Sequence, residues 1–250
     1  MTLIELIKCV LIGFTEGIII NYVADVMPRS RRLVRPLCPN CQKAYTFYQY
    51  LFSFKCQNCG NKSSIRHLIV LIVSILCSIA VFLFPLNSIN YFATIPIFLF
   101  LGSILVIDIE HRVVLIETSL VGLILFFVYG IYQNGFIFTL LGGVSGFLLM
   151  LLIYFFGILF SKGLGKIRKQ EIEEVALGLG DVYTCGFLGL LTGYPLIIGS
   201  ILLAIIASGI FSFFYISIKL LFKDYHAFTA IPYTPFLIAG AVATFYIRIS

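Results

Sequence analysis

Long runs of apolar residues, separated by short polar stretches, dominate the chain. A helix of about 20 apolar residues spans the hydrocarbon core of a bilayer, where the backbone finds no water to bond with. Eight apolar runs, of which 182–191 is short, lie at about 3–23, 68–84, 91–107, 113–132, 136–160, 182–191, 196–221 and in a last segment ending near residue 249. The pattern predicts an all-α, polytopic membrane protein with about eight transmembrane helices.

The composition points the same way. Of the 250 residues, 60% are hydrophobic and 11% are charged, and the mean hydropathy is +1.07. A soluble domain has about 25% charged residues, and its core could not bury this much apolar surface. A soluble globular protein is therefore excluded, and the lipid bilayer is the expected surrounding of the chain.

The positive charge is concentrated in one loop. Eight of the 17 lysines and arginines fall between residues 25 and 66, namely Arg29, Arg31, Arg32, Arg35, Lys43, Lys55, Lys62 and Arg66. Basic loops of this length stay in the cytoplasm. The alternating topology then places the loops at 108–112, 161–180 and 222–230 on the same side, while the connections at 85–90, 133–135 and 192–195 carry no Lys or Arg. The positive-inside rule explains the basic cluster, so no nucleic-acid partner is expected.

The loop from about 24 to 66 also contains two Cys-x-x-Cys pairs, 14 residues apart. Two such knuckles are close to the spacing of a zinc ribbon, in which four thiolates close a tetrahedral structural site. The alternatives are disulfides or free thiols, and the cytoplasm disfavours disulfides. We therefore expect a structural Zn²⁺ bound in this insert, with the ligands Cys38, Cys41, Cys56 and Cys59.

Two domains follow from this division of the chain. Residues 1–66 would comprise the first transmembrane helix and the cytoplasmic four-cysteine insert, which is zinc-ribbon-like. Residues 67–250 would form the main membrane domain, which holds the two acids described next.

Two aspartates lie at the ends of apolar segments. Asp108 ends one segment, and Asp181 begins another directly after Gly178-Leu179-Gly180. Ionisable residues in membrane segments are energetically costly and point to function. Taken singly, Asp108 could be an interfacial charge and Asp181 a helix cap. The predicted topology nevertheless puts both on the same membrane face.

Two aspartates that share one proton can hydrolyse a peptide bond. The ionised one takes a proton from water, and the neutral one polarises the peptide carbonyl. Gly178 and Gly180 leave room for a substrate backbone to approach. The alternative is a proton- or cation-coupled transporter, which also uses intramembrane carboxylates. Transport sites lie near the bilayer midplane, whereas Asp108 and Asp181 lie at its boundary.

In the order of its motifs, the chain resembles the type IV prepilin peptidases, which are membrane aspartic proteases of the GxGD class. The resemblance covers nearly the whole chain. It consists of an opening Gly-x-x-x-Asn and Pro-Arg, paired cysteine knuckles, an Ile-Asp segment, the Gly-x-Gly-Asp segment and a closing Ile-Pro-x-x-Pro-Phe, at residues 17–21, 27–29, 38–59, 107–112, 178–181 and 231–236. The cysteine insert argues for the prepilin branch over archaeal preflagellin or presenilin-like proteases.

The resemblance implies a specific activity. The enzyme would cut the short basic leader from type IV prepilins or pseudopilins, with Asp108 and Asp181 as the catalytic pair. It would act in the bacterial inner membrane with its active site facing the cytoplasm. Many relatives then methylate the new N-terminus with S-adenosylmethionine, and Glu16, Gly17 and Asn21 are the candidates for that region.

The chain departs from the family pattern at two places. The Pro-Asp that usually closes the first catalytic motif falls on Leu115-Ile116, and the nearest acid is Glu117. The lysine usual two positions after the GxGD aspartate is Tyr183. Neither departure replaces a catalytic aspartate, so both bear on local geometry and substrate preference.

Overall fold

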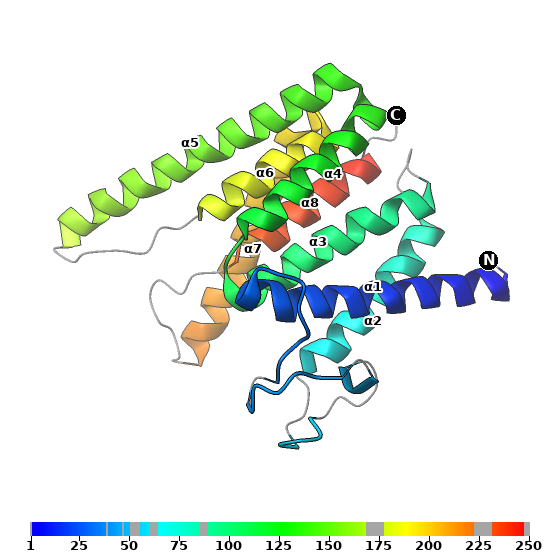
Figure 1. Ribbon diagram of the computed structural model, residues 1–250. Helices are drawn as coiled ribbons and strands as arrows, with labels where there is room; N and C mark the ends of the chain where they lie inside the picture. The colour runs from blue at the N-terminus through cyan, green and yellow to red at the C-terminus, as the bar shows by residue number, and fades with distance from the viewer. Residues whose placement is uncertain are drawn as a thin grey trace. The chain divides into compact units, whose positions relative to one another are not determined.

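The computed structural model describes residues 2–38, 40–46, 48–50, 56–60, 65–85, 90–168, 178–222 and 232–247. These residues form eight α-helices and no extended strand (Figure 1), which confirms the predicted all-helical class. The helices are α1 (Leu3–Ser30), α2 (Ile65–Leu83), α3 (Tyr91–His111), α4 (Ile116–Asn134), α5 (Phe136–Arg168), α6 (Leu179–Thr192), α7 (Leu196–Leu221) and α8 (Thr234–Ile247).

Some positions named from the sequence lie outside this described part. They are Lys55 and Lys62 of the basic loop, the charged stretch at 169–177, most of the loop at 222–230, and Ile231, which opens the last motif.

Five of the described helices, α2, α3, α4, α5 and α7, are long and apolar enough to cross a membrane. The apolar helices α6 and α8 are shorter, with 14 residues each. Large side chains such as Phe155 and Phe213 point outward from the longer helices. In a bilayer these exposed apolar side chains face lipid, so the protein is embedded in a membrane.

The chain forms two compact units, Met1–His111 and Arg112–Ser250. In the first unit, α1 packs against both α2 and α3. Two glycines let α1 approach α2 closely, since a Cβ at Gly13 would lie 2.6 Å from the Cα of Ile75, and one at Gly17 would lie 3.0 Å from the Cα of Leu71. The division into functional domains after residue 66, expected from the sequence, stays a prediction.

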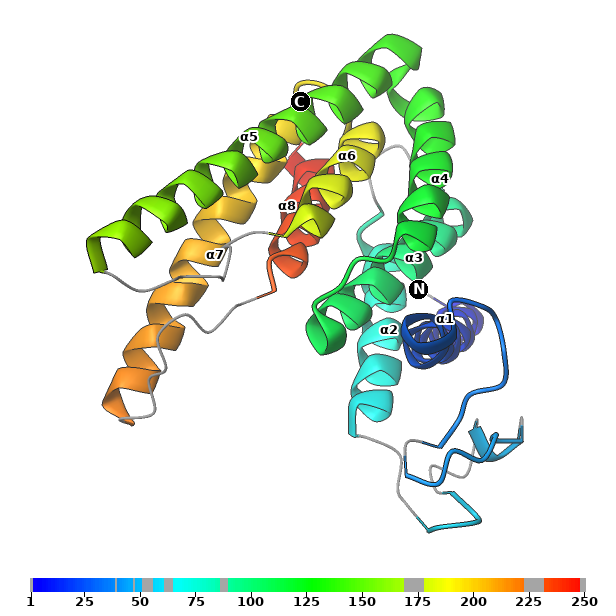
Figure 2. The same ribbon diagram turned by 60° about the vertical axis from the view of Figure 1, so that its left-hand side comes forward.

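In the second unit, α6 packs against α4, α5, α7 and α8 (Figure 2). Most of its residues are buried, including Leu188 and Leu191. Glycines also bring α5 close to α6, because Gly142 of α5 meets Gly189 of α6 backbone to backbone. The short helix α6, with 14 residues, is thus the buried centre of its unit.

Several helix boundaries predicted from hydrophobicity were wrong, including the end of α5, which continues from 160 to Arg168. α1 continues from 23 to Ser30 and ends where Arg31 adopts a left-handed conformation, with φ 51°. α3 continues past 107 to His111, so Asp108 lies inside the helix, and α4 begins at Ile116 instead of 113. α1 and α3 run on because a helix can project beyond the apolar layer, where the apolar pattern stops, whereas the apolar Val113 and Val114 belong to the connection before α4.

Candidate active site and cysteine cluster

Asp181 lies in the first turn of α6, as the sequence predicted. Gly178 is the residue before the helix, and its N–H donates to the Asp181 carboxylate at 3.2 Å. The hydroxyl of Thr234, at the start of α8, donates to the other carboxylate oxygen at 3.1 Å. The side chain is only 9% exposed. Two donors and the positive end of the helix dipole stabilise an anion at this position.

The two glycines of the Gly-x-Gly-Asp turn differ in their surroundings. Gly178 has φ −87°, and the nearest described atom to a Cβ there would be 3.8 Å away. A Cβ at Gly180 would lie 2.8 Å from the Cβ of Val114. Gly180 is therefore required for packing within the unit, and the role of both glycines in admitting a substrate stays a prediction.

Asp108 lies in the last turn of α3 and is 6% exposed. The preceding Val106 and Ile107 are buried as well, whereas Ile109 is exposed. A carboxylate near a helix C-terminus opposes the helix dipole. Asp108 and Asp181 belong to different compact units, and their pairing stays a prediction.

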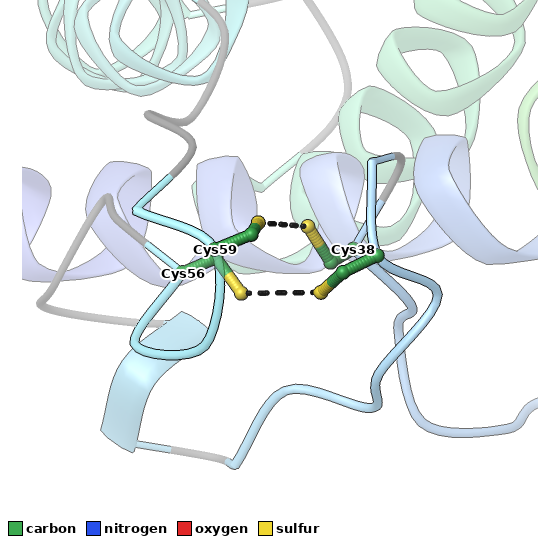
Figure 3. Close-up of side chains that lie close together, drawn as sticks. Cys38, Cys56 and Cys59 are labelled. Carbon is green, nitrogen blue, oxygen red and sulfur yellow. Dashed lines mark hydrogen bonds between the residues drawn. The ribbon is translucent and has the colours of Figure 1, made fainter.

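The four cysteines of the insert come together (Figure 3). Their sulfur atoms all lie within 4.8 Å of one another. The Sγ atoms of Cys38 and Cys59 are 3.6 Å apart, and those of Cys41 and Cys56 are 3.7 Å apart. A disulfide would need about 2.05 Å, so these cysteines are free thiols. Four sulfurs about 2.3 Å from a central Zn²⁺ would be about 3.8 Å from each other in a tetrahedron, which fits this cluster.

Backbone N–H groups stabilise the thiolate form of the cysteines, which is the form that binds a cation. The N–H of Cys41 bonds to the Cys38 sulfur and lowers the pKa of that thiol to about 6, with smaller help from the Tyr45 hydroxyl and the N–H of Asn40. The N–H groups of Cys59 and Asn58 lower the pKa of Cys56 in the same way. Thiolates are the form that binds metal, so the cluster can hold a metal ion at neutral pH.

The three residues considered for methylation lie on α1. Glu16 is 6% exposed, and Gly17 packs against α2. The side-chain N–H of Asn21 donates to the carbonyl of His67 at 3.1 Å, while its buried Oδ1 has no hydrogen-bond partner among the described residues. The glycine has a clear packing role, and the part of all three in methyl transfer stays a prediction.

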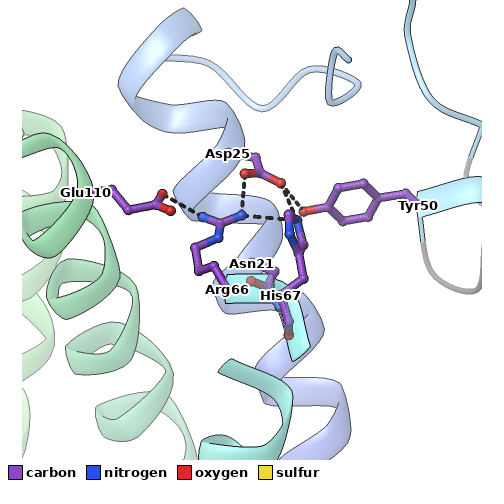
Figure 4. Close-up of polar contacts among 6 residues, drawn as sticks. All are labelled: Asn21, Asp25, Tyr50, Arg66, His67 and Glu110. Carbon is purple, nitrogen blue, oxygen red and sulfur yellow. Dashed lines mark hydrogen bonds and ion pairs between the residues drawn. The ribbon is translucent and has the colours of Figure 1, made fainter. Parts of the chain in front are cut away.

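Sequence reasoning missed two groups of residues. Thr234 was noticed only as part of the closing motif at 231–236, and no pattern indicated that it would reach Asp181. The second group is a polar network of Asp25, Tyr50, Arg66, His67 and Glu110 (Figure 4). From the sequence, Arg66 is only one of the basic residues that set the topology, and no pattern links it to Asp25 or Glu110.

Comparison with known protein families gives a match to the segment that contains both acids. Residues 93–213 match the model of the type IV leader peptidase family. The match runs from the first turn of α3 into α7 and contains Asp108 and Asp181. No curated protein and no solved structure matches the chain.

Proposed function

Because this chain belongs, through residues 93–213, to the type IV leader peptidase family, we propose that it is an aspartic endopeptidase with Asp108 and Asp181 as its catalytic pair. The observation that carries the proposal is the presence, in that matched span, of two buried acids on terminal turns of helices. No other described acid within 93–213 is buried.

The two acids divide the chemistry. Asp181 is the ionised partner, because the first turn of α6 and the donors Gly178 and Thr234 favour its anion. Asp108 is the neutral partner, because the last turn of α3 disfavours a negative charge. Asp181 takes a proton from water, the water oxygen bonds to the peptide carbon, and Asp108 gives its proton to the carbonyl oxygen. When the C–N bond breaks, the amine leaves with the proton that Asp181 had taken, and the proton on the former carbonyl oxygen returns to Asp108.

The substrate is a type IV prepilin or pseudopilin with a short basic leader. Such a leader remains on the cytoplasmic side for the same reason as the basic loop of the enzyme. Both acids lie near the predicted cytoplasmic ends of their helices, so the peptide bond is cut where the leader meets the inner membrane. The transporter alternative has no specific observation in its favour.

The cysteine cluster belongs to the same proposal as a structural Zn²⁺ site. Cys38, Cys41, Cys56 and Cys59 would hold the ion, which would supply the folding free energy that a short insert lacks. Methylation of the new N-terminus with S-adenosylmethionine is a second activity. The only observation in its favour is the buried Oδ1 of Asn21 on α1, which has no hydrogen-bond partner among the described residues.

The test is cleavage of a prepilin leader by the purified protein in detergent, read by mass spectrometry. Wild type should cut the leader, and Asp108→Asn and Asp181→Asn should each leave it intact while still inserting and folding. Glu117→Gln, which removes a nearby acid outside the pair, is the matched control and should cut normally. A methyl mass gained with S-adenosylmethionine would establish the second activity.

Three results would count against the proposal. Cleavage by either single aspartate variant would contradict the pair. An intact leader in wild type, across several prepilins, would contradict the peptidase. Proton flux in liposomes that Asp181→Asn abolishes, without any proteolysis, would favour the transporter.

A further inference from the structure

The polar network of Figure 4 joins three helices of the first unit to the cysteine insert. Arg66, at the start of α2, bonds to the carboxylate of Asp25 on α1 at 2.5 Å and to that of Glu110 on α3 at 2.8 Å. The hydroxyl of Tyr50, from the insert, donates to Asp25 at 2.7 Å. His67 also contacts Asp25, at 2.9 Å.

This network differs from an ordinary surface ion pair. The side chain of Arg66 is only 13% exposed and lies between two carboxylates. Arginine stays charged and presents its donors in a rigid plane. Burial by itself raises the pKa of Asp25, but the His67 hydrogen bond and the Arg66 charge outweigh it and lower that pKa. The charged groups are therefore matched, and removing one leaves the others partly buried without compensation.

The network continues to the cysteine cluster. The ring of Tyr50 packs against that of Tyr45, with centroids 6.1 Å apart. Tyr45 is tied to the segment that holds Cys38, because its N–H donates to the carbonyl of Pro36 at 2.9 Å and the N–H of Cys38 donates to the carbonyl of Lys43 at 2.9 Å. A path of direct contacts thus runs from the cluster through Tyr45, Tyr50 and Asp25 to Arg66.

At its other end the network holds the last turn of α3. Glu110 lies two residues after Asp108 in the same helical turn. An anchor on Glu110 restricts the rotation and fraying of this turn, which otherwise ends a helix with no described capping side chain. We propose that Arg66 is a positioning residue that fixes the turn carrying Asp108, and that the metal-loaded cysteine cluster supports it through Tyr50. The meaning for catalysis rests on the proposed function.

Hydrogen–deuterium exchange of the full protein in detergent tests the anchor without relying on activity. In Arg66→Gln, the amides of 106–111 should exchange about tenfold faster than in wild type. Glu110→Gln, a milder change at a more exposed residue, should do the same, and the double variant should add nothing further. Arg35→Gln removes the same charge from an exposed position of the insert and is the control.

The metal part of the proposal is tested by Cys56→Ser and by chelation. Both should speed exchange at 106–111 as well as in the insert. Exchange at 106–111 that stays at the wild-type rate in Arg66→Gln and Glu110→Gln overturns the anchor. Unchanged exchange there in Cys56→Ser and after chelation overturns the support from the cluster.

Kinetic measurements distinguish a change in the position of Asp108 from a general loss of protein stability. If Asp108 is catalytic, Arg66→Gln should lower kcat about tenfold with KM within about twofold, and Arg66→Lys, which keeps one ion pair, should restore part of kcat. An equal loss in Arg66→Lys and Arg66→Gln overturns the proposed geometry. A wild type that cuts no leader defeats the proposed function, while the exchange experiment still decides the anchor.

Discussion

Asp181 receives hydrogen bonds from two donors that lie 3 and 53 residues away along the chain. The nearer donor, the N–H of Gly178, follows from the local helix start. The farther one, Thr234, can be found only from the packing of α8 against α6. At the scale of single residues, the sequence thus predicted which carboxylate to consider but not what holds it.

Replacing Thr234 by Val keeps the side-chain volume and removes the donor to Asp181. A hydrogen bond to a charged group contributes about 1.5–3 kcal/mol, so kcat/KM for leader cleavage should fall about tenfold or more. Thr234→Ser keeps the hydroxyl and should remain within a few-fold of wild type. Equal activities of the Val and Ser variants would show that this hydrogen bond does not matter for the reaction.

The two glycines before Asp181 should respond differently to alanine. Gly180→Ala places a methyl group against Val114, and overpacking of this kind costs about 1–3 kcal/mol. Gly178→Ala makes only ordinary van der Waals contact with described atoms, the nearest at 3.8 Å, and should leave thermal stability unchanged. Melting of both variants in detergent checks this, and Val114→Gly should partly rescue Gly180→Ala. A larger loss in Gly178→Ala than in Gly180→Ala would contradict the packing argument.

At the scale of elements, α5 and α6 meet through glycines instead of interlocking large side chains. A Cβ at Gly189 would collide with the carbonyl of Gly142, and one at Gly142 would collide with that of Gly189. Close backbone approach of this kind is a common basis of helix association in membranes. The glycines of α5 are visible in the sequence, but only the packing of the helices shows that they meet Gly189 of α6.

Gly189→Ala should therefore lower stability by about 1–3 kcal/mol, because two backbones would have to separate. Gly157→Ala, on the partner helix α5 and with no described atom within 4 Å of its added Cβ, is the control and should be neutral. Thermal unfolding of both variants in detergent is the measurement. Indistinguishable melting temperatures would rule out a tight contact at this point.

The cysteine insert should bind about one equivalent of Zn²⁺ per chain, and Cys56→Ser should lose it. The pH dependence follows from the thiols. The pKa of Cys38 is lowered to about 6, so its thiolate persists through neutral pH and is protonated as the pH falls through that value. Because a bound metal competes with protons for the thiolates, we expect the metal to be retained at pH 7 and released only well below pH 6. Metal analysis after gel filtration at each pH checks this, and less than about half an equivalent at pH 7 under reducing conditions would contradict a closed site.

At the scale of the whole molecule, the topology predicts where a protease can cut. Trypsin needs Lys or Arg, and the connections at 85–90, 133–135 and 192–195 have neither. In right-side-out vesicles the chain should stay almost whole, since Lys8 and Arg248 lie close to its ends. In inverted vesicles trypsin should cut within the exposed part of the insert, for example at Lys43. Cutting at the insert in right-side-out vesicles would invert the topology.

The sequence by itself determined the membrane class, the number of helices and the candidate chemistry. Apolar runs predict helices because a bilayer leaves the backbone no other partner, and this reasoning needs no long-range contact. The Cys-x-x-Cys spacing and the Gly-x-Gly-Asp turn are local as well, so Cys38, Cys41, Cys56, Cys59 and Asp181 could be named in advance. Residues beyond the apolar layer could not be assigned in this way, which is why the ends of α1 and α3 were misplaced.

Only the tertiary structure decided which distant residues surround these positions. The hydroxyl of Thr234 on Asp181, and the Arg66 bridge between Asp25 and Glu110, join residues that are 41 to 53 positions apart. No periodicity records such contacts, because they depend on how helices rotate and cross when they pack. A charged residue at a helix end has the same sequence pattern whether it faces water or a partner. From the sequence, Arg66 is only a basic residue that indicates topology, and only the fold shows that it lies between two carboxylates.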